Sequence, residues 1–261
     1  MHPIESIKAR FVRPRQQKRF EKTAYGKKLK KYYNKHKGER CFIVANGPSL
    51  RAEDLDLLHS KGESTFAMNR IFKIFDQTNW RPTYYVCEDE LIAKDCQAEI
   101  NAVEANEKFI PIEIKWWHDI NIENALHFHL NYVDALRTPY NFSTDVSHQI
   151  DCRGTVTCTC LQFAAYMGFS EIYLIGVDHN FQKVIDENGN VIEDKTVKDY
   201  FIEGYDADIK ESVIHDLGTT TKSYLDVKKY CDETKRTTVY NATRGGKLEV
   251  FQRVDFDSLF K

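Results

Sequence analysis

The chain lacks any apolar run that approaches the roughly 18–20 residues needed to span a bilayer. Its N-terminus is charged and carries no apolar segment, so we expect no secretory signal there. No internal repeat or low-complexity tract appears either. With 42% hydrophobic residues, the 261-residue chain is expected to form one large soluble domain or at most two small ones.

Paired C-x-x-C motifs are also missing. The seven cysteines are irregularly spaced, and Cys158 and Cys160 in the stretch CRGTVTCTC have no nearby His/Cys pair that would complete a zinc site. We interpret the cysteines as buried free thiols of a protein in a reducing cytoplasm.

Acidic residues are scarce only at the start of the chain. Residues 1–40 carry 14 Lys or Arg against 3 Asp or Glu, a balance of +11, whereas the remaining residues carry 23 against 36. Basic residues interleaved with aromatic ones are typical of a segment that binds an anionic membrane. Each basic residue near such a surface contributes about 1 kcal/mol to binding. The alternative is a helical arm packed on its own domain or on a partner subunit. Nucleic acid is disfavoured as a partner, because the acidic body repels phosphates.

Past residue 40, short apolar runs alternate with helical patterns. We predict strands at 41–45, 64–69, 82–88, 108–114 and 170–178, with 237–242 as the last strand, and helices at 52–60, 92–106, within 154–168 and at 221–235. This alternation indicates an α/β domain with a Rossmann-like, mostly parallel sheet and helices on both faces. The polar stretch 180–220 is too long for an ordinary connection, so we interpret it as a lid or binding loop.

The first predicted strand runs into the turn Asn46-Gly47-Pro48-Ser49. Ligands of such sheets bind beyond the carboxyl ends of the strands, and a helix N-terminus there is a good phosphate site. Gly47 would allow close approach of a ligand, Asn46 offers a donor and an acceptor, and Ser49 is expected to cap the following helix. An ordinary strand–turn–helix connection is the alternative.

Polar residues follow the other predicted strands and precede the buried helix at 154–168. These segments are Asn69-Arg70, Glu88-Asp89-Glu90, Asp151-Cys152-Arg153-Gly154-Thr155, Asp178-His179-Asn180 and Thr243-Arg244-Gly245-Gly246-Lys247. Because parallel strands end at one edge of a sheet, these residues are expected to form one ligand site.

On these motifs, from NGPSL through GTVT, GFSEIYLIGVDH and YNATRGGKLEVF, the chain resembles the MptE-like family over roughly residues 40–258. That family includes a 6-hydroxymethylpterin diphosphokinase and proteins of polysaccharide gene clusters. The scaffold is also similar to the metal-independent bacterial sialyltransferases of lipooligosaccharide synthesis. The resemblance leaves the basic arm unexplained.

The resemblance implies a cytidine monophosphate (CMP) donor and a set of nucleotide-binding residues. These are Asn46, Gly47, Ser49, Asn69, Arg153, Gly154, Thr155, Val156, Thr157, Asp178 and Asn180. The polar strand ends add Arg70 and Asp89 as nucleotide-binding candidates. The segment at 178–180 would lie at the phosphate, where the sialyltransferases use tyrosine hydroxyls, so this sequence departs from their pattern. The general base of the sialyltransferases is a His in the loop before the last long helix. By helix register, that position falls near Thr219 in this chain. His215 is therefore the first candidate for the base, and His179 is the second.

Two other groups of side chains have competing interpretations. Glu88, Asp89 and Glu90 are expected to form a solvated acidic turn, although they imitate a carboxylate motif that binds divalent ions in sugar transferases. His127 and His129 would share one face of a strand, and packing is favoured over metal ligation. Neither group predicts a metal site.

We therefore predict a basic arm at 1–39 and a catalytic domain at 40–261 that needs no metal. The predicted enzyme is a sialyltransferase-like glycosyltransferase that moves an acidic nine-carbon (nonulosonic) sugar from a CMP donor to a glycan or glycolipid acceptor in bacterial surface polysaccharide synthesis. It would act in the cytoplasm or peripherally at the inner face of the plasma membrane, and a homo-oligomer is compatible with the sequence. The alternatives are a Mg²⁺-dependent pterin pyrophosphokinase, with Asp89 and Asp178 as ligands, and a non-catalytic nucleotide-sugar-binding partner.

Overall fold

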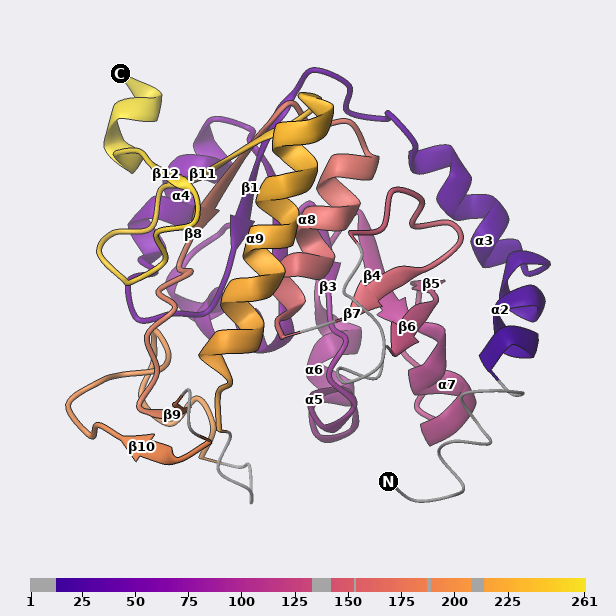
Figure 1. The fold of residues 1–261 in the computed structure, drawn as a ribbon, viewed down its shortest axis with the longest axis horizontal. Coiled ribbons are helices and arrows are strands. Elements are labelled where there is room, and N and C mark those ends of the chain that lie inside the picture. The colour runs from indigo at the N-terminus through magenta and orange to yellow at the C-terminus, as the bar shows by residue number, and fades with distance from the viewer. Residues whose placement is uncertain (1–12, 133–141, 153, 187–188, 208–213) are drawn as a thin grey trace.

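The computed structural model describes residues 13–132, 142–152, 154–186, 189–207 and 214–261. Its centre is an eight-stranded, wholly parallel sheet (Figure 1) in the order β12-β11-β8-β1-β2-β3-β4-β5. The strands are β1 (Arg40–Val44), β2 (Ser64–Met68), β3 (Tyr84–Val86), β4 (Glu107–Pro111), β5 (Ala125–Phe128), β8 (Glu171–Ile175), β11 (Thr238–Asn241) and β12 (Gln252–Arg253). The predicted Rossmann-like α/β fold is therefore confirmed.

Strand β1 shows how the sequence builds this sheet. Alternate residues point to opposite faces, so Cys41 and Ile43 pack into one hydrophobic cluster while Phe42 and Val44 pack into the other. All four are fully buried, which explains why the strand reads as a continuous apolar run.

Helices cover both faces. One face carries α8 (Val156–Tyr166) and α9 (Leu217–Thr234), which lie side by side in front of the sheet in Figure 1. The other carries α4 (Ala52–Ser60), the 3₁₀ segment η3 (Asn69–Gln77), α5 (Glu90–Asp95), α6 (Gln97–Ala102) and the C-terminal η4 (Phe256–Phe260), with α7 (Ile112–His118) at the end of β4. Within the described ranges, every helix is too short or too polar to cross a bilayer.

The structure corrects several of the predicted elements. The helix expected at 92–106 is two short helices, α5 and α6, and the strand expected at 108–114 ends at Pro111, which cannot donate to the ladder. Helix α9 begins at Leu217 because the Asp216 carboxylate caps it by accepting from the Thr219 amide. The strand at β11 is not the last, since β12 pairs with its outer edge.

Two small two-stranded sheets complete the molecule. Strand β6 (Leu130–Tyr132) pairs with β7 (Ile150–Cys152), and β9 (Lys183–Ile185) pairs with β10 (Val191–Glu193) in a hairpin. The hairpin lies inside the segment that the sequence predicted to be a lid or binding loop.

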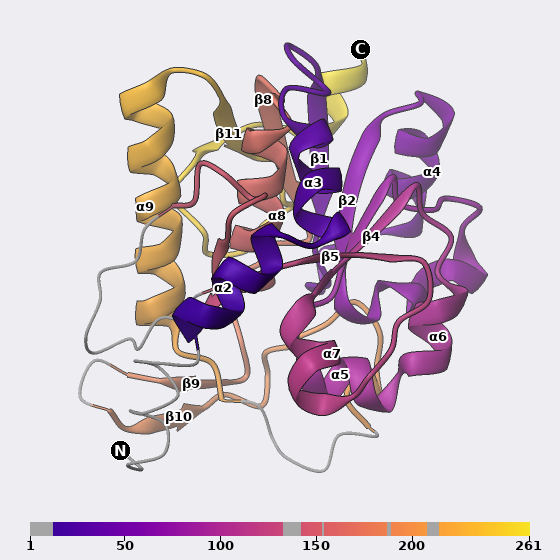
Figure 2. The same ribbon diagram turned by 90° about the vertical axis from the view of Figure 1, so that its right-hand side faces the viewer.

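The part of the basic arm that the structure describes, from residue 13 onward, is packed on the rest of the chain. Helices α2 (Arg13–Glu21) and α3 (Ala24–Leu29) and the turn η2 (Lys30–Tyr32) lie along the β5 side of the sheet, in front of it in Figure 2. Phe20 and Leu29 are completely buried, and the Tyr32 hydroxyl donates to Glu107 Oε2 at 2.6 Å. Of the two interpretations of the arm, its described part follows the packed helical one.

Candidate functional site

A cavity of about 480 Å³ opens at the carboxyl ends of the central strands. Strands β1 and β8 are neighbours, but the chain leaves them in opposite directions across the sheet, so this edge is the topological switch point at which such folds bind ligands. Of the predicted site residues, those lining the cavity are Asn46, Gly47, Asn69, Asp89, Gly154, Thr155, Val156, Thr157, Asp178, His179, Asn180 and His215. The structure thus brings together most of what the sequence singled out.

The Asn-Gly-Pro-Ser turn packs against the loop that follows β8. The Gly47 amide donates to the Gly176 carbonyl at 2.8 Å, and a Cβ atom on Gly47 would lie only 2.1 Å from Asp178 Oδ2. The absence of a side chain at Gly47 is therefore required first by contact between two loops, rather than by approach to a ligand.

Ser49 has a different partner from the one that the sequence predicted. Its hydroxyl donates to Asp178 Oδ2 at 2.7 Å, and its amide also bonds to that oxygen, while Arg51 occupies the N-cap position of α4 without a side-chain bond. The capping prediction for Ser49 was wrong, because Asp178, in the loop after β8, accepts from the hydroxyl. Burial raises the pKa of Asp178, and the two Ser49 donors oppose that shift.

Two asparagines that line the cavity carry buried amide oxygens without a partner. Asn46 is nine-tenths buried; its Nδ2 donates to the Met68 carbonyl at 3.1 Å, which fixes the orientation of the amide. Its Oδ1 and the Oδ1 of Asn69 are buried, and among the described residues neither has a hydrogen-bond partner. Leaving such an acceptor unpaired costs about 1–3 kcal/mol, so these oxygens indicate a ligand that supplies donors.

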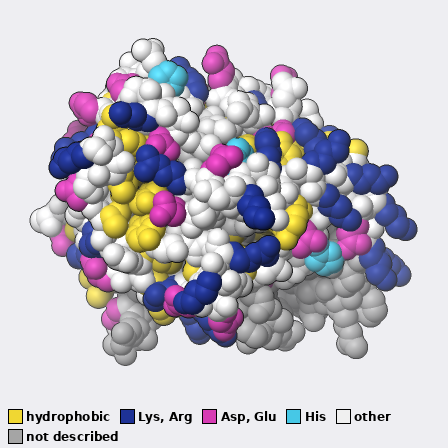
Figure 3. Space-filling view, turned by 90° about the horizontal axis from the view of Figure 1, so that it is seen from above, with side chains coloured by type: hydrophobic (Ala, Val, Ile, Leu, Met, Phe, Trp, Pro, Cys, Tyr) yellow, Lys and Arg dark blue, Asp and Glu magenta, His cyan; other side chains and the backbone are white. Residues whose placement is uncertain are grey.

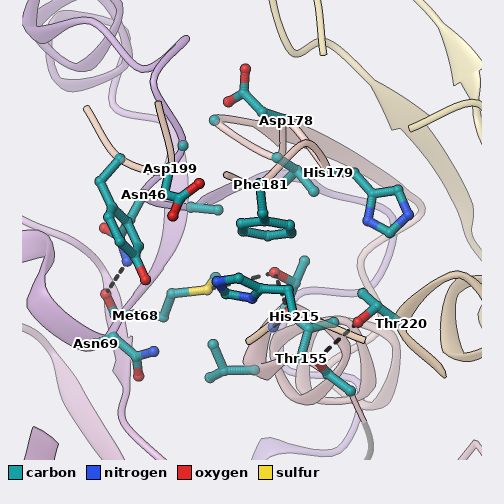
Figure 4. Close-up of a pocket in the computed structure, with 18 of the residues that line it drawn as sticks. Asn46, Met68, Asn69, Thr155, Asp178, His179, Phe181, Asp199, His215 and Thr220 are labelled. Carbon is teal, nitrogen blue, oxygen red and sulfur yellow. Dashed lines mark hydrogen bonds between the residues drawn. The ribbon is translucent and has the colours of Figure 1, made fainter. Parts of the chain in front are cut away.

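The N-terminus of α8 forms another wall. Thr155 caps the helix by accepting from the Thr157 amide at 3.3 Å, and the Thr220 hydroxyl of α9 donates to the Gly154 carbonyl (Figure 4). Gly154 has a positive φ of 76°, and a Cβ atom there would lie 3.0 Å from the Thr220 Cα. The helix end offers partial positive charge to an anion. Arg153 lies outside the described residues.

His215 stacks on Phe181 inside the cavity. The two ring centroids are 3.7 Å apart and the rings are nearly parallel, as Figure 4 shows. His215 Nε2 is buried and has no hydrogen-bond partner within the described structure. Burial lowers the pKa of His215, and the Asp199 charge opposes that shift, so the ring is neutral and able to accept a proton near pH 7.

His179 differs from His215 in having a partner. It lies at the other side of the cavity from Asn46 in Figure 4, and its Nε2 is 2.8 Å from the Thr221 hydroxyl. Its backbone is left-handed, with a φ of 51°, and burial lowers its pKa. The hydrogen bond orients this imidazole toward α9, which leaves His215 as the freer base.

The segment from Asp199 to Asp206 closes the cavity on one side. The Phe201 amide donates to the Asn46 carbonyl at 3.1 Å, and the Arg70 guanidinium donates to the Tyr205 carbonyl at 2.8 Å. Arg70, predicted to bind nucleotide, is completely buried and lies behind this wall rather than among the residues that line the cavity. Its role in the structure is to hold the wall against the end of β2.

Tyr200 and Tyr205 are among the side chains that the sequence missed. Their rings stack 3.9 Å apart, and both line the cavity, as do Asp199 and Asp206. The pattern predicted only that this stretch was a lid or binding loop, because the contacts that direct its tyrosines inward come from Arg70 and Asn46, more than a hundred residues away. Phe181, Thr220 and Tyr224 were missed for the same reason.

The carboxylates after β3 have separate partners. Glu88 accepts from the Thr159 hydroxyl, Asp89 caps α5 through the amides of Leu91 and Ile92, and Glu90 pairs with His118. Only Glu88 and Asp89 of the three line the cavity. Among the described residues, no group of three or more His, Cys, Asp or Glu is arranged to hold a metal ion.

The buried histidines and cysteines lie elsewhere in the core. His127 bonds the Ile110 carbonyl at 3.1 Å and His129 pairs with the buried Glu113, which confirms the packing interpretation. The described cysteine side chains are buried free thiols: Cys41, Cys87, Cys96, Cys158, Cys160 and Cys231.

Comparison with known proteins supports both the fold and the family. Among solved structures, the MAf glycosyltransferase from Magnetospirillum magneticum AMB-1 is similar, with a TM-score of 0.52 and 16% identity over 90% of this chain. This chain spans 38% of the length of that protein, and at this identity the likeness shows a shared fold alone. No curated protein matches the chain.

A family model described as 6-hydroxymethylpterin diphosphokinase MptE-like matches residues 16–184. The match begins inside α2, so it includes much of the arm that the sequence motifs left unexplained, and it ends within β9, before α9. It covers more than half of the chain and contains the loops after β1, β2, β3 and β8. The chain therefore belongs to the MptE-like family.

Proposed function

We propose that the protein is a glycosyltransferase that takes a sugar from a nucleotide-activated donor and passes it to a glycan acceptor. The observation that carries this proposal concerns Asn46 and Asn69, which line a cavity at the switch point of the sheet: each has a buried amide oxygen without a hydrogen-bond partner among the described residues. Ribose and sugar hydroxyls are donors that match such acceptors. The glycosyltransferase with a similar fold is consistent with this class of reaction.

The donor that we propose is a CMP sugar. The cavity has a wall made by the N-terminus of α8, where Thr155 and Thr157 meet the ligand, and a wall made by Tyr200 and Tyr205. Two tyrosines therefore line the cavity, although the motif at 178–180 carries none; the Tyr205 hydroxyl accepts from the Arg70 amide at 3.2 Å. A monophosphate leaving group can be stabilised by amides and hydroxyls, so no metal is required in this proposal.

His215 is proposed as the general base. Its neutral imidazole takes the proton of an acceptor hydroxyl, the hydroxyl oxygen bonds to the anomeric carbon, and the bond between that carbon and the phosphate oxygen breaks, so that CMP leaves with the electron pair. The Phe181 stack holds the imidazole in place, because one face of its ring is covered at 3.7 Å.

The identity of the sugar and the setting of the reaction are further parts of the proposal. We propose a nonulosonic acid as the transferred sugar and a growing glycan or glycolipid of a bacterial surface polysaccharide as the acceptor. The reaction would take place in the cytoplasm, where nucleotide-activated sugars are made.

A Mg²⁺-dependent pyrophosphokinase acting on a pterin is the second candidate, and one observation favours it. The described lining contains five carboxylates, Glu88, Asp89, Asp178, Asp199 and Asp206, and no Lys or Arg. A divalent cation bound there would neutralise part of this negative charge and so reduce the repulsion of a nucleoside triphosphate. Asp89 and Asp178 would be its ligands, although each already accepts hydrogen bonds through one oxygen.

Thermal-shift measurements with CMP, CDP, UDP, GDP and ATP, each with and without Mg²⁺, separate the two candidates. We expect CMP or CDP to stabilise the fold without metal, by about 2.7 kcal/mol at 100 times the dissociation constant. Stabilisation by ATP with Mg²⁺ alone would overturn the transferase proposal in favour of the pyrophosphokinase. Stabilisation by no nucleotide would overturn both.

A further inference from the structure

The arm presents a rigid cationic surface, which we call the arm face: the exposed side chains of residues 18–37. All nine Lys and Arg in this range are exposed, and the range contains a single carboxylate, Glu21, which pairs with His148 at 2.7 Å. Lys and Arg side chains gather at the right-hand side of Figure 3, over the arm helices at the right of Figure 1.

Apolar anchors hold this surface in place. Phe20 and Leu29 are completely buried, and the His36 ring stacks on Phe169 with centroids 4.5 Å apart. The anchors fix the helices, so that the cations stay on one outward side without a bound partner. Packing against the domain therefore fixes the positions of these charges.

Two aromatic residues near the two ends of the arm are exposed. Tyr33 on the arm is 49% exposed and Trp117 on α7 is 41% exposed. The Arg19 guanidinium sits 5.1 Å from the ring centre of Trp116, which joins α2 to α7, and both helices face the viewer in Figure 2. Cations together with amphipathic aromatic rings are the composition that settles at the boundary between water and lipid headgroups.

We infer that the arm face binds an anionic lipid surface. The charge distribution of the whole chain favours a membrane over a nucleic acid. Residues 41–261 carry 23 basic and 36 acidic residues. A long polyanion that extends beyond the arm would be repelled by this acidic part of the chain, whereas a planar membrane would contact the arm face alone. The inference is independent of the reaction proposed for the cavity.

Vesicle co-sedimentation of the full chain tests this inference. Vesicles of phosphatidylcholine with phosphatidylglycerol should retain the protein, vesicles of phosphatidylcholine alone should not, and rising salt should release it. The variant Lys27→Gln/Lys30→Gln/Lys31→Gln removes three exposed cations of the arm face. At roughly fivefold per cation, it should lower partitioning roughly 100-fold.

A matched control carries the same change in net charge on another helix. Lys222→Gln/Lys228→Gln/Lys229→Gln alters three exposed lysines of α9 and should leave vesicle binding unchanged. Thermal unfolding of both variants checks that they are folded. The inference would be overturned if the two variants lost vesicle binding equally, or if the wild type did not bind anionic vesicles. Arm-dependent binding to single-stranded RNA without vesicle binding would also overturn it, and would assign the surface to nucleic acid.

Discussion

Replacing His215 with Ala tests the assignment of the general base. Among the described residues the imidazole makes no hydrogen bond, so its main structural contribution is the stack on Phe181, worth about 0.5–1.5 kcal/mol. The main chain of this residue stays paired with β9, since its amide donates to Lys183 and its carbonyl accepts from Ile185, both at 3.0 Å. We therefore expect His215→Ala to remain folded.

The expected kinetic effect is larger than the effect on stability. Removing a general base lowers turnover by about 10²–10⁴-fold, whereas CMP affinity, measured by calorimetry, should change little. The relevant assay follows CMP release from a CMP sugar in the presence of a glycan acceptor. His179→Ala is the comparison: its imidazole bonds Thr221 and lines the cavity, so its loss should weaken nucleotide binding as well as rate.

The pH profile gives an independent check. Burial lowers the pKa of His215 below its ordinary value of 6.5, so the neutral, basic form persists to lower pH than in a free imidazole. The wild-type rate should fall only as the pH drops below 6.5, through the lowered pKa, and His215→Ala should lack this acid limb. Full activity of His215→Ala with a loss of turnover in His179→Ala would exchange the two roles. Activity in both variants would refute the assignment of a His as the general base and make Asp178 or Asp216 the next candidate for that role.

Three further predictions concern binding and stability. Asn46→Ala removes an unpaired buried acceptor, so nucleotide affinity should fall about 10–100-fold by calorimetry; unchanged affinity would mean that the ligand does not reach this oxygen. Gly47→Ala places a methyl group 2.1 Å from Asp178 Oδ2, and denaturant unfolding should show a loss of about 1–3 kcal/mol, which an unchanged midpoint would contradict. Deleting residues 1–38 removes the buried Phe20 and Leu29, each worth roughly 2–5 kcal/mol, so circular dichroism should show a domain that is unfolded or strongly destabilised; a retained melting temperature would refute this.

The sequence predicted the sheet because its signals are local. A run such as Cys41–Val44 is apolar on both faces, and this property belongs to the residues themselves wherever the chain places them. The ends of such strands carry Asn46, Asn69 and Asp178, and the parallel arrangement then requires them to meet at one edge. The helix α4 was predicted at its observed bounds for a similar reason, since Leu55 and Leu58 repeat at helical spacing.

Only the tertiary structure decided which side chains at that edge are available to a ligand. Ser49 follows a strand in the sequence, yet its hydroxyl is used by Asp178 from 129 residues away. Arg70 was a candidate ligand residue, but the fold buries it behind Tyr205. Hydrogen-bond partners of this kind depend on distances between distant segments, which no local pattern records. The local apolar pattern therefore determined the layers. Packing between loops determined that Asn46 and His215, rather than Ser49 and Arg70, line the cavity.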